Sequence, residues 1–378
     1  MTESSSSLGI GSLLDPDRFS AENTIDLGPD HPSSAGLLTM EMTLAEGVIQ
    51  RLDVQPGALH RGAEMLFEVR DYRQILSLAN RHDWQAPFFG ELVVATLVER
   101  ELGIEIPFRA AWIRTLLAEH HRVISHLAHL SFVAHRLGRA DLATSRLREE
   151  LRRRSLELTG NRLHPMAVRL GGIAVDPTPD WLERAAATHA DAAELALRLR
   201  EALDGTGLGR GVGVLSPEDV SGYGLSGSVA RASGVGEDVR RDRPDLAYPA
   251  LAAELTPPSA PSDGDAASRF AWWAAEVAQS AGLVRACAER LPEGELTAHL
   301  PKSVKLPEGD FYAEVEAPLG RAGAFIVSRA DRTPWRLRLR TPSMANVSAW
   351  DAAARGERPD DLPIVLASLG YVTGDLDK

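Results

Sequence analysis

The chain has 378 residues, of which 44% are hydrophobic and 25% are charged. These proportions are those of a soluble globular protein, and they exclude a wholly disordered or fibrous chain. The formal net charge is −12. Such an excess of acid disfavours binding to nucleic acid through its phosphates, so we expect no nucleic-acid partner.

The single cysteine, Cys287, limits the chemistry that the chain can carry by itself. One thiol cannot form an internal disulfide and cannot supply a four-thiolate zinc or iron–sulfur site. We therefore expect an intracellular protein with no metal or iron–sulfur cluster in this chain. The sequence has no run of 18 apolar residues, so it predicts no transmembrane helix.

The first half of the chain predicts a short sheet followed by helices. Residues 1–26 begin with a serine-rich stretch, and we expect a flexible arm there. Residues 37–55 alternate apolar and polar side chains around Glu46 and Gly47, which predicts a β-hairpin. A helical period then marks a helical body over 62–204. Its predicted helices cover 63–82, 91–103, 109–138, 145–160 and 178–204.

The second half predicts loops and then a mixed C-terminal part. Residues 205–268 are rich first in glycine and then in proline and alanine, and we expect loops. Residues 269–378 predict an α/β part, with a helix at about 266–292, strands within 314–342 and a last helical turn or two at 361–369. The predicted fold class is α+β, a mainly helical body with small β-sheets from the N- and C-terminal regions. We expect these sheets to meet in a single domain over 27–378.

Two motifs could indicate a bound cofactor, and both have ordinary explanations. GYGLSG at 222–227 has the form G-x-G-x-x-G, but no predicted strand precedes it, so a flexible loop is the better interpretation. His126 and His129 share one side of a predicted helix and could bind a metal as a pair. Core or surface histidines are the simpler interpretation.

Several arginines occur within or beside apolar stretches, where a guanidinium usually pairs with a carboxylate. Glu64, Asp71, Asp83 and Glu119 are available partners. One interpretation is a set of ordinary structural ion pairs. The other is a polar axis through the core, as in redox-linked proton machinery. The arginines concerned are Arg61, Arg70, Arg81, Arg114, Arg122, Arg162 and Arg169.

Strings along the chain resemble, in order, the D subunit of NADH–quinone oxidoreductase, respiratory complex I. LGPDHPSSAG at 27–36 is similar to the opening motif of that family, and LASLGYVTGDLDK at 366–378 ends as the family ends. The likeness extends over about 27–378. The other similar strings lie at 58–72, 109–127, 157–176, 230–244, 314–328 and 334–347.

The resemblance implies a fold like that of nickel–iron hydrogenase large subunits, without their metal. Asp83, Ala86, Val372 and Asp375 stand where hydrogenases carry cysteines. It also implies that quinone is the substrate, bound beside an iron–sulfur subunit. Other peripheral-arm subunits and membrane-arm subunits are implied as partners, on the cytoplasmic side of the cell membrane. NADH enters only at the level of the complex.

Three positions depart from the family pattern at the quinone site. Ala35 replaces a histidine that contacts the headgroup, and Trp84 replaces the tyrosine that is the other contact. Arg136 replaces an acidic residue that is thought to pair with that histidine. Alanine offers no side-chain hydrogen bond, and an indole offers no phenolic proton. The catalytic competence of the chain itself therefore stays open.

We carry two hypotheses from the resemblance. In the first, the chain lines a quinone site, with His31 and Asp83 handling protons and Ala35, Arg81, Trp84 and Arg136 lining the pocket. The alternative is a non-catalytic scaffold or assembly paralogue that has kept the fold and lost quinone reduction. A turn of structural importance is expected in either case, at His60, Arg61 and Gly62.

Overall fold

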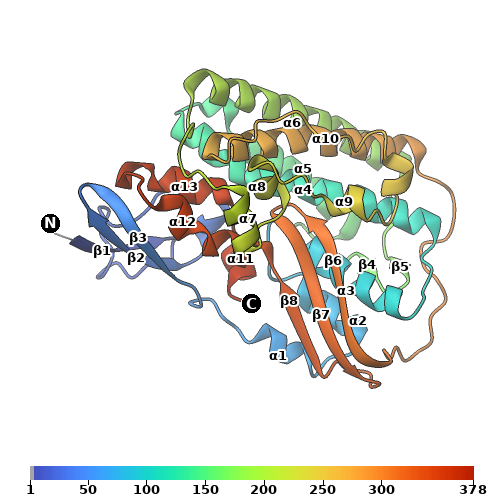
Figure 1. The fold of residues 1–378 in the computed structure, drawn as a ribbon. Coiled ribbons are helices and arrows are strands. Elements are labelled where there is room, and N and C mark those ends of the chain that lie inside the picture. The colour runs from blue at the N-terminus through green and yellow to red at the C-terminus, as the bar shows by residue number, and fades with distance from the viewer. Residues whose placement is uncertain (1–3) are drawn as a thin grey trace.

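The computed structural model describes residues 4–378, which begin with an antiparallel sheet in the order β1-β2-β3 (Figure 1). The predicted hairpin is formed by β2 (Leu38–Ala45) and β3 (Val48–Gln55). Its turn residues Glu46 and Gly47 have φ of 55° and 81°, as a tight hairpin turn with two left-handed residues requires.

The predicted flexible arm at 1–26 is corrected for Ser4–Ile10, which form the edge strand β1. The serine-rich composition hid the alternation at its end, where Leu8 and Ile10 are buried against the core. Pairing with β2 satisfies the backbone groups on the side of this segment that faces β2. Residues 1–3 of the predicted arm lie outside the described residues.

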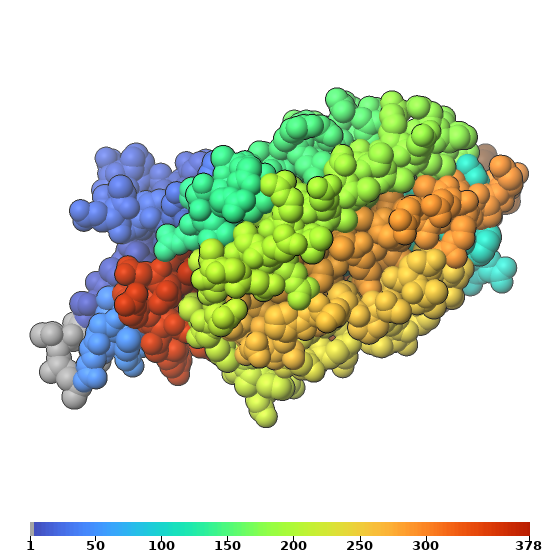
Figure 2. Space-filling view, turned by 90° about the horizontal axis from the view of Figure 1, so that it is seen from above, coloured from blue at the N-terminus to red at the C-terminus, as the bar shows by residue number. Residues whose placement is uncertain are grey.

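Five long helices build the body, and α4 is their centre (Figure 1). Every residue of α4 from Ala110 to Ala134 is buried, so its polar side chains must find partners inside the protein. Helices α6 and α10 run side by side along the molecule (Figure 2). The long helices are α3 (Phe88–Glu101), α4 (Phe108–Arg136), α5 (Ser145–Thr159), α6 (Pro179–Thr206) and α10 (Ala266–Arg290).

The single helix predicted at 63–82 is two helices, α1 (Ala63–Phe67) and α2 (Tyr72–Ala79). The side chain of Asp71 accepts hydrogen bonds from the backbone of Arg73 and Gln74, and the Gln74 side chain accepts one from the Asp71 N–H. This capping box starts a new helix, although the apolar period continues through it.

The loops predicted at 205–268 contain three short helices, α7 (Pro217–Tyr223), α8 (Gly227–Ala232) and α9 (Val239–Asp242). Ser216 and Asp219 form a capping box at the start of α7. The prediction of a loop followed the high glycine content and missed this helix-start signal. GYGLSG therefore begins in the last turn of α7 and ends at the first residue of α8, and no strand directly precedes it. It lacks the strand–turn–helix context of a dinucleotide fingerprint.

A second antiparallel sheet, β6-β7-β8, packs one face against α3. The two sheets share no strand; the C-terminal helices lie between them, and α12 contacts β3 (Figure 1). Two short strands, β4 (Val168–Arg169) and β5 (Gly172–Ile173), pair separately. The C-terminal elements are β6 (Glu308–Ala317), β7 (Gly320–Arg329), β8 (Arg336–Arg340), α11 (Pro342–Ser348), α12 (Trp350–Ala354), α13 (Leu362–Leu369) and α14 (Thr373–Leu376).

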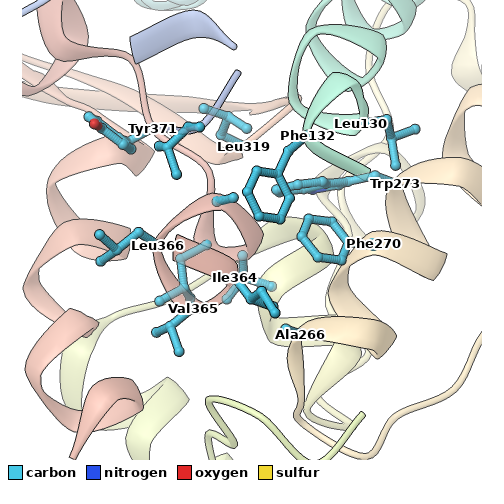
Figure 3. Close-up of a cluster of buried hydrophobic side chains, with 14 of the residues drawn as sticks. Leu130, Phe132, Ala266, Phe270, Trp273, Leu319, Ile364, Val365, Leu366 and Tyr371 are labelled. Atoms are coloured by element: carbon cyan, nitrogen blue, oxygen red, sulfur yellow. The ribbon is translucent and has the colours of Figure 1, made fainter. Parts of the chain in front are cut away.

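The core where α4, α10 and α13 meet fixes the C-terminal segment (Figure 3). Phe132 stacks on Phe270 with ring centroids 5.9 Å apart, and Trp273 meets Phe270 edge-on at 5.7 Å. Tyr371 is fully buried beside Trp350, with centroids 4.9 Å apart. Aromatic packing of this kind holds the chain on either side of residue 371 in one conformation.

One buried ion pair joins α3 to α4. Arg114 is wholly inaccessible to solvent and donates to both carboxylate oxygens of Glu99, at 2.7 and 2.6 Å. It also donates to the carbonyls of Arg169 and Gly172. This two-pronged geometry is the kind that offsets the cost of burying a guanidinium.

We expect Glu99→Gln to lower the free energy of unfolding by about 3–5 kcal/mol, because it leaves the Arg114 charge buried without a counter-ion. Glu101→Gln, in the last turn of the same helix beside the exposed Arg100, is the matched control. It should change stability by less than about 1 kcal/mol. Urea unfolding of both variants measures the difference, and equal losses would contradict the assignment.

Candidate functional site

Three segments far apart in the sequence meet at residues 371–375. Gly36, just after the short helix η1 (Pro32–Ala35), lies against Thr373, and Trp84 lies against Gly374. A β-carbon at position 36 would stand 2.4 Å from Thr373 Oγ1, and one at position 374 would stand 2.2 Å from Trp84 Cζ3. Only glycine permits this close approach, so the three segments are held in direct contact.

His31 begins η1 and is buried. Its Nδ1 accepts from the backbone N–H of Ser33 at 3.3 Å, which assigns the ring proton to Nε2. Nε2 has no partner in the described part of the chain. Burial, with His129 and Arg148 nearby, holds the pKa of His31 well below its usual value. At neutral pH the ring is therefore an uncharged N–H donor.

Asp83, which is half-buried, and the buried Asp375 form an acidic pair. Asp83 accepts from the backbone of Gln85 and Ala86 at 2.9 and 3.0 Å. Burial and the neighbouring Asp375 raise the pKa of Asp83 to about 7, and burial also raises the pKa of Asp375. The pair is therefore protonated in a substantial fraction of the molecules at neutral pH. Both carboxyls line a cavity of about 30 Å³, room for a water molecule.

The remaining predicted residues lie at different depths around this contact. Trp84 is half-buried, whereas Ala35 and Arg81 are exposed. The Arg81 guanidinium approaches Met166 Sδ at 3.8 Å. Arg136 is exposed in the last turn of α4, and within residues 4–378 no hydrogen bond joins it to the contact.

The predicted turn at His60, Arg61 and Gly62 leads into α1. Gly62 is its N-cap, with φ of 64° in the left-handed region that favours glycine. His60 and Arg61 are exposed, and the Arg61 guanidinium donates to the carbonyl of Arg81 at 3.3 Å. The turn thus touches the segment that carries Asp83.

Our candidate residues from the sequence omitted Asp375 and His82. His82 is buried and lines the same cavity as the acidic pair. Burial lowers its pKa to about 4. The only available signal for Asp375 was its place at a position where hydrogenases carry a cysteine. The partner of an acidic pair 292 residues away cannot be found from spacing.

The core also contains a chain of buried charges, built partly from the predicted arginines. Arg114 and Arg122 are buried, but the other five predicted arginines are exposed. Arg122 pairs with Glu119 at 3.2 Å, as its neighbour Arg240 does at 3.3 Å. The members that the sequence did not single out are Arg231, Asp238, Arg240, Glu276 and Glu316.

The two histidines considered as a metal pair have protein partners. His126 bonds to Glu276, and His129 bonds to the carbonyls of Ser125 and Tyr371. Within the described residues, no three His, Cys, Asp or Glu side chains gather as ligands for a metal ion.

Comparison with known proteins shows one family. Residues 140–305 and 299–378 match the family model described as the 49 kDa subunit of the respiratory-chain NADH dehydrogenase. The chain is 42% identical to a D subunit of NADH-quinone oxidoreductase from Streptomyces coelicolor, over 98% of each chain. It is 32% identical to the D subunit from Desulforamulus reducens, over 94% of this chain and 98% of that one.

A solved structure has the same fold. It belongs to the membrane-bound sulfane sulfur reductase, an archaeal respiratory membrane complex. The TM-score is 0.82 at 28% identity, over 90% of this chain and 94% of that chain. The predicted α+β fold of the hydrogenase large-subunit type and the resemblance to the D subunit are confirmed.

We expect Asp375→Asn to flatten the pH dependence of stability between pH 5.5 and 8. The folded-state pKa of Asp83, about 7, lies above the unfolded value of about 3.9. The contribution of Asp83 to the free energy of unfolding is therefore present at low pH and is lost as pH rises through 7. Removing the Asp375 charge lowers the pKa of Asp83. The free energy of unfolding that is lost between pH 5.5 and 8 should therefore be smaller than in the unmodified chain, by about 1–2 kcal/mol. Asp360→Asn, on the surface, should leave the slope unchanged in urea titrations.

Proposed function

Because the chain belongs to the family of the 49 kDa subunit of the respiratory-chain NADH dehydrogenase, called the D subunit of NADH-quinone oxidoreductase in its relatives, we propose that it forms one wall of a quinone site. The electrons come from an iron–sulfur cluster in a neighbouring subunit. This chain supplies binding groups and protons, and NADH is oxidised elsewhere in the complex.

The contact of the three segments at 371–375 carries the proposal. It combines an uncharged imidazole with an unpartnered N–H, at His31, and an acidic pair that is protonated in a substantial fraction of the molecules at neutral pH, at Asp83 and Asp375. Reduction of a quinone to a quinol takes up two electrons and two protons. A hydrogen-bond donor and a protonated carboxyl are the groups that this reaction needs at the headgroup.

The headgroup binds on an open wall and not in a closed cavity of this chain. The cavity at the acidic pair, about 30 Å³, is far smaller than a quinone ring. The half-buried Trp84 offers a flat aromatic face, and the exposed Ala35 leaves space where a larger residue would stand. A neighbouring subunit closes the site from the other side.

A cationic rim beside this wall is suited to that neighbour. Arg61 and Arg81 are in contact and exposed, and Arg169 reaches the carbonyl of Met166, whose sulfur Arg81 approaches. Opposite charge on a partner steers and orients association. We assign this rim to the iron–sulfur subunit.

Membrane association belongs to the assembled complex. In the described residues no helix combines the length and the apolarity needed to cross a bilayer. We propose that the chain lies at the periphery of the complex, held by membrane-arm subunits on the cytoplasmic side. A scaffold without quinone reduction is the alternative, and it is not favoured by relatives that are all named as oxidoreductase subunits.

Restoring the family's headgroup contacts tests the quinone site. We expect the double variant Ala35→His and Trp84→Tyr to raise quinone-linked NADH oxidation several-fold in the assembled complex, because it adds an imidazole and a phenolic proton. Oxidation of NADH by a soluble acceptor should be unchanged and reports that the upstream path is intact. An assembled double variant with unchanged quinone turnover would favour the scaffold.

Charge reversal tests the assigned partner. We expect Arg61→Glu with Arg81→Glu to reduce recovery of the iron–sulfur subunit at least tenfold when the tagged chain is purified in mild detergent. Arg329→Glu with Arg338→Glu, on exposed arginines of the second sheet, is the matched control. Mass spectrometry of the recovered proteins measures both. Equal recovery from the two double variants would refute the assignment of the rim.

A further inference from the structure

His126 and Glu276 form a buried pair that ends the charge network in the core. His126 Nε2 lies 3.0 Å from Glu276 Oε2, and both side chains are at most 1% exposed. Burial disfavours the charged form of Glu276, but Arg231 and His126 outweigh it and hold its pKa well below the usual range. An ionised carboxylate only accepts, so the ring proton is on Nε2.

The other ring nitrogen is a vacant proton acceptor. With the proton on Nε2, Nδ1 of His126 keeps a bare lone pair. Within residues 4–378 this Nδ1 is buried and has no hydrogen-bond partner. The ring also stacks on Trp273, with centroids 6.3 Å apart and planes at 21°.

The charges around the pair favour an added proton. A single guanidinium, Arg231, serves three carboxylates, Glu276 at 2.5 Å, Glu316 at 2.8 Å and Asp238 at 3.8 Å. Farther along, Asp238 and Glu119 alternate with Arg240 and Arg122. The wholly buried network thus has four carboxylates and three guanidiniums. Arg241 reaches Asp238 from a partly exposed position, away from His126.

Among residues 4–378, no ion pair joins His121 or His129 of α4 to a carboxylate. Burial lowers the pKa of His121 to about 3 and that of His129 to about 4. Burial also lowers the pKa of His126, and Arg122 and Arg240 lower it further. Glu276 opposes them through its hydrogen bond and its charge. His129, one turn away, adds a repulsion only if it is itself protonated.

We propose that His126 is a proton-uptake site of the core, with Nδ1 accepting one proton while the Nε2–H remains bonded to Glu276. One proton binds and none is released, so an imidazolium neutralises the excess carboxylate. The Glu316 end of the network reaches the surface through a hollow of about 510 Å³, lined also by Arg240 and Tyr248.

The site also lies close to the proposed quinone wall. His129, three residues after His126, meets His31 edge-on with centroids 5.5 Å apart. Negative charge that develops at the headgroup attracts a proton and therefore raises the proton affinity of His126. This coupling rests on the proposed function, whereas the uptake site itself does not.

Titration of the full chain tests the proposal. In protein labelled with ¹³C and ¹⁵N in histidine, we expect NMR between pH 5 and 8.5 to show His126 titrating at least one pH unit above His121 and His129. His126→Gln identifies its signals by their loss. Glu276→Gln should lower the proton affinity of His126 at least tenfold. Glu289→Gln, at an exposed position of the same helix α10, should leave it unchanged.

A His126 ring whose Nδ1 stays unprotonated down to pH 5, as in its two neighbours, would overturn the proposal. If Glu276→Gln does not fold, the titration of His126 in the unmodified chain still tests the proposal. The measurement uses no quinone and no partner. If His126 titrates but the assembled complex reduces no quinone, the proposed function is wrong and the uptake site still stands.

Discussion

The structure depends on a central helix whose buried surface includes charged side chains. Helix α4 is buried on every side over 25 residues, yet it includes Arg114, Glu119 and Arg122. A buried charge is tolerated only with a counter-ion and with its hydrogen bonds satisfied. The segments that supply these partners, among them Glu99 of α3, Arg240 of α9 and Glu316 of β6, are therefore restricted in position more tightly than by apolar packing alone.

These partners explain the placing of segments that have little regular structure. Helices α8 and α9 are short, but Arg231 and Arg240 join them to α10, β6 and α4 through ion pairs. A different contact joins α4 to the candidate site, where the ring of His129 meets the ring of His31 edge-on. The candidate site is thus built from residues held by the core, although part of its surface faces outward.

Local signals in the sequence predicted the elements, and long-range pairing was invisible to them. Glu46 and Gly47 marked the hairpin because a tight turn needs their backbone conformations. The break at Asp71 was missed because a cap can start a new helix without interrupting the apolar period. For the site, the resemblance supplied His31 and Asp83. Asp375, Arg231 and Glu276 act through partners distant in the sequence, and no spacing rule identifies such pairs.

The charged groups of this chain fall into two classes that respond differently to ionic strength. The pairs of Arg114 and Arg231 are buried, where dissolved ions do not reach them. The rim at Arg61 and Arg81 is exposed, and charges on a wet surface are screened over about 8 Å at physiological salt. Concentrated salt therefore weakens what the rim holds and leaves the interior intact. A salt wash would release this chain from an acidic neighbour in its folded form.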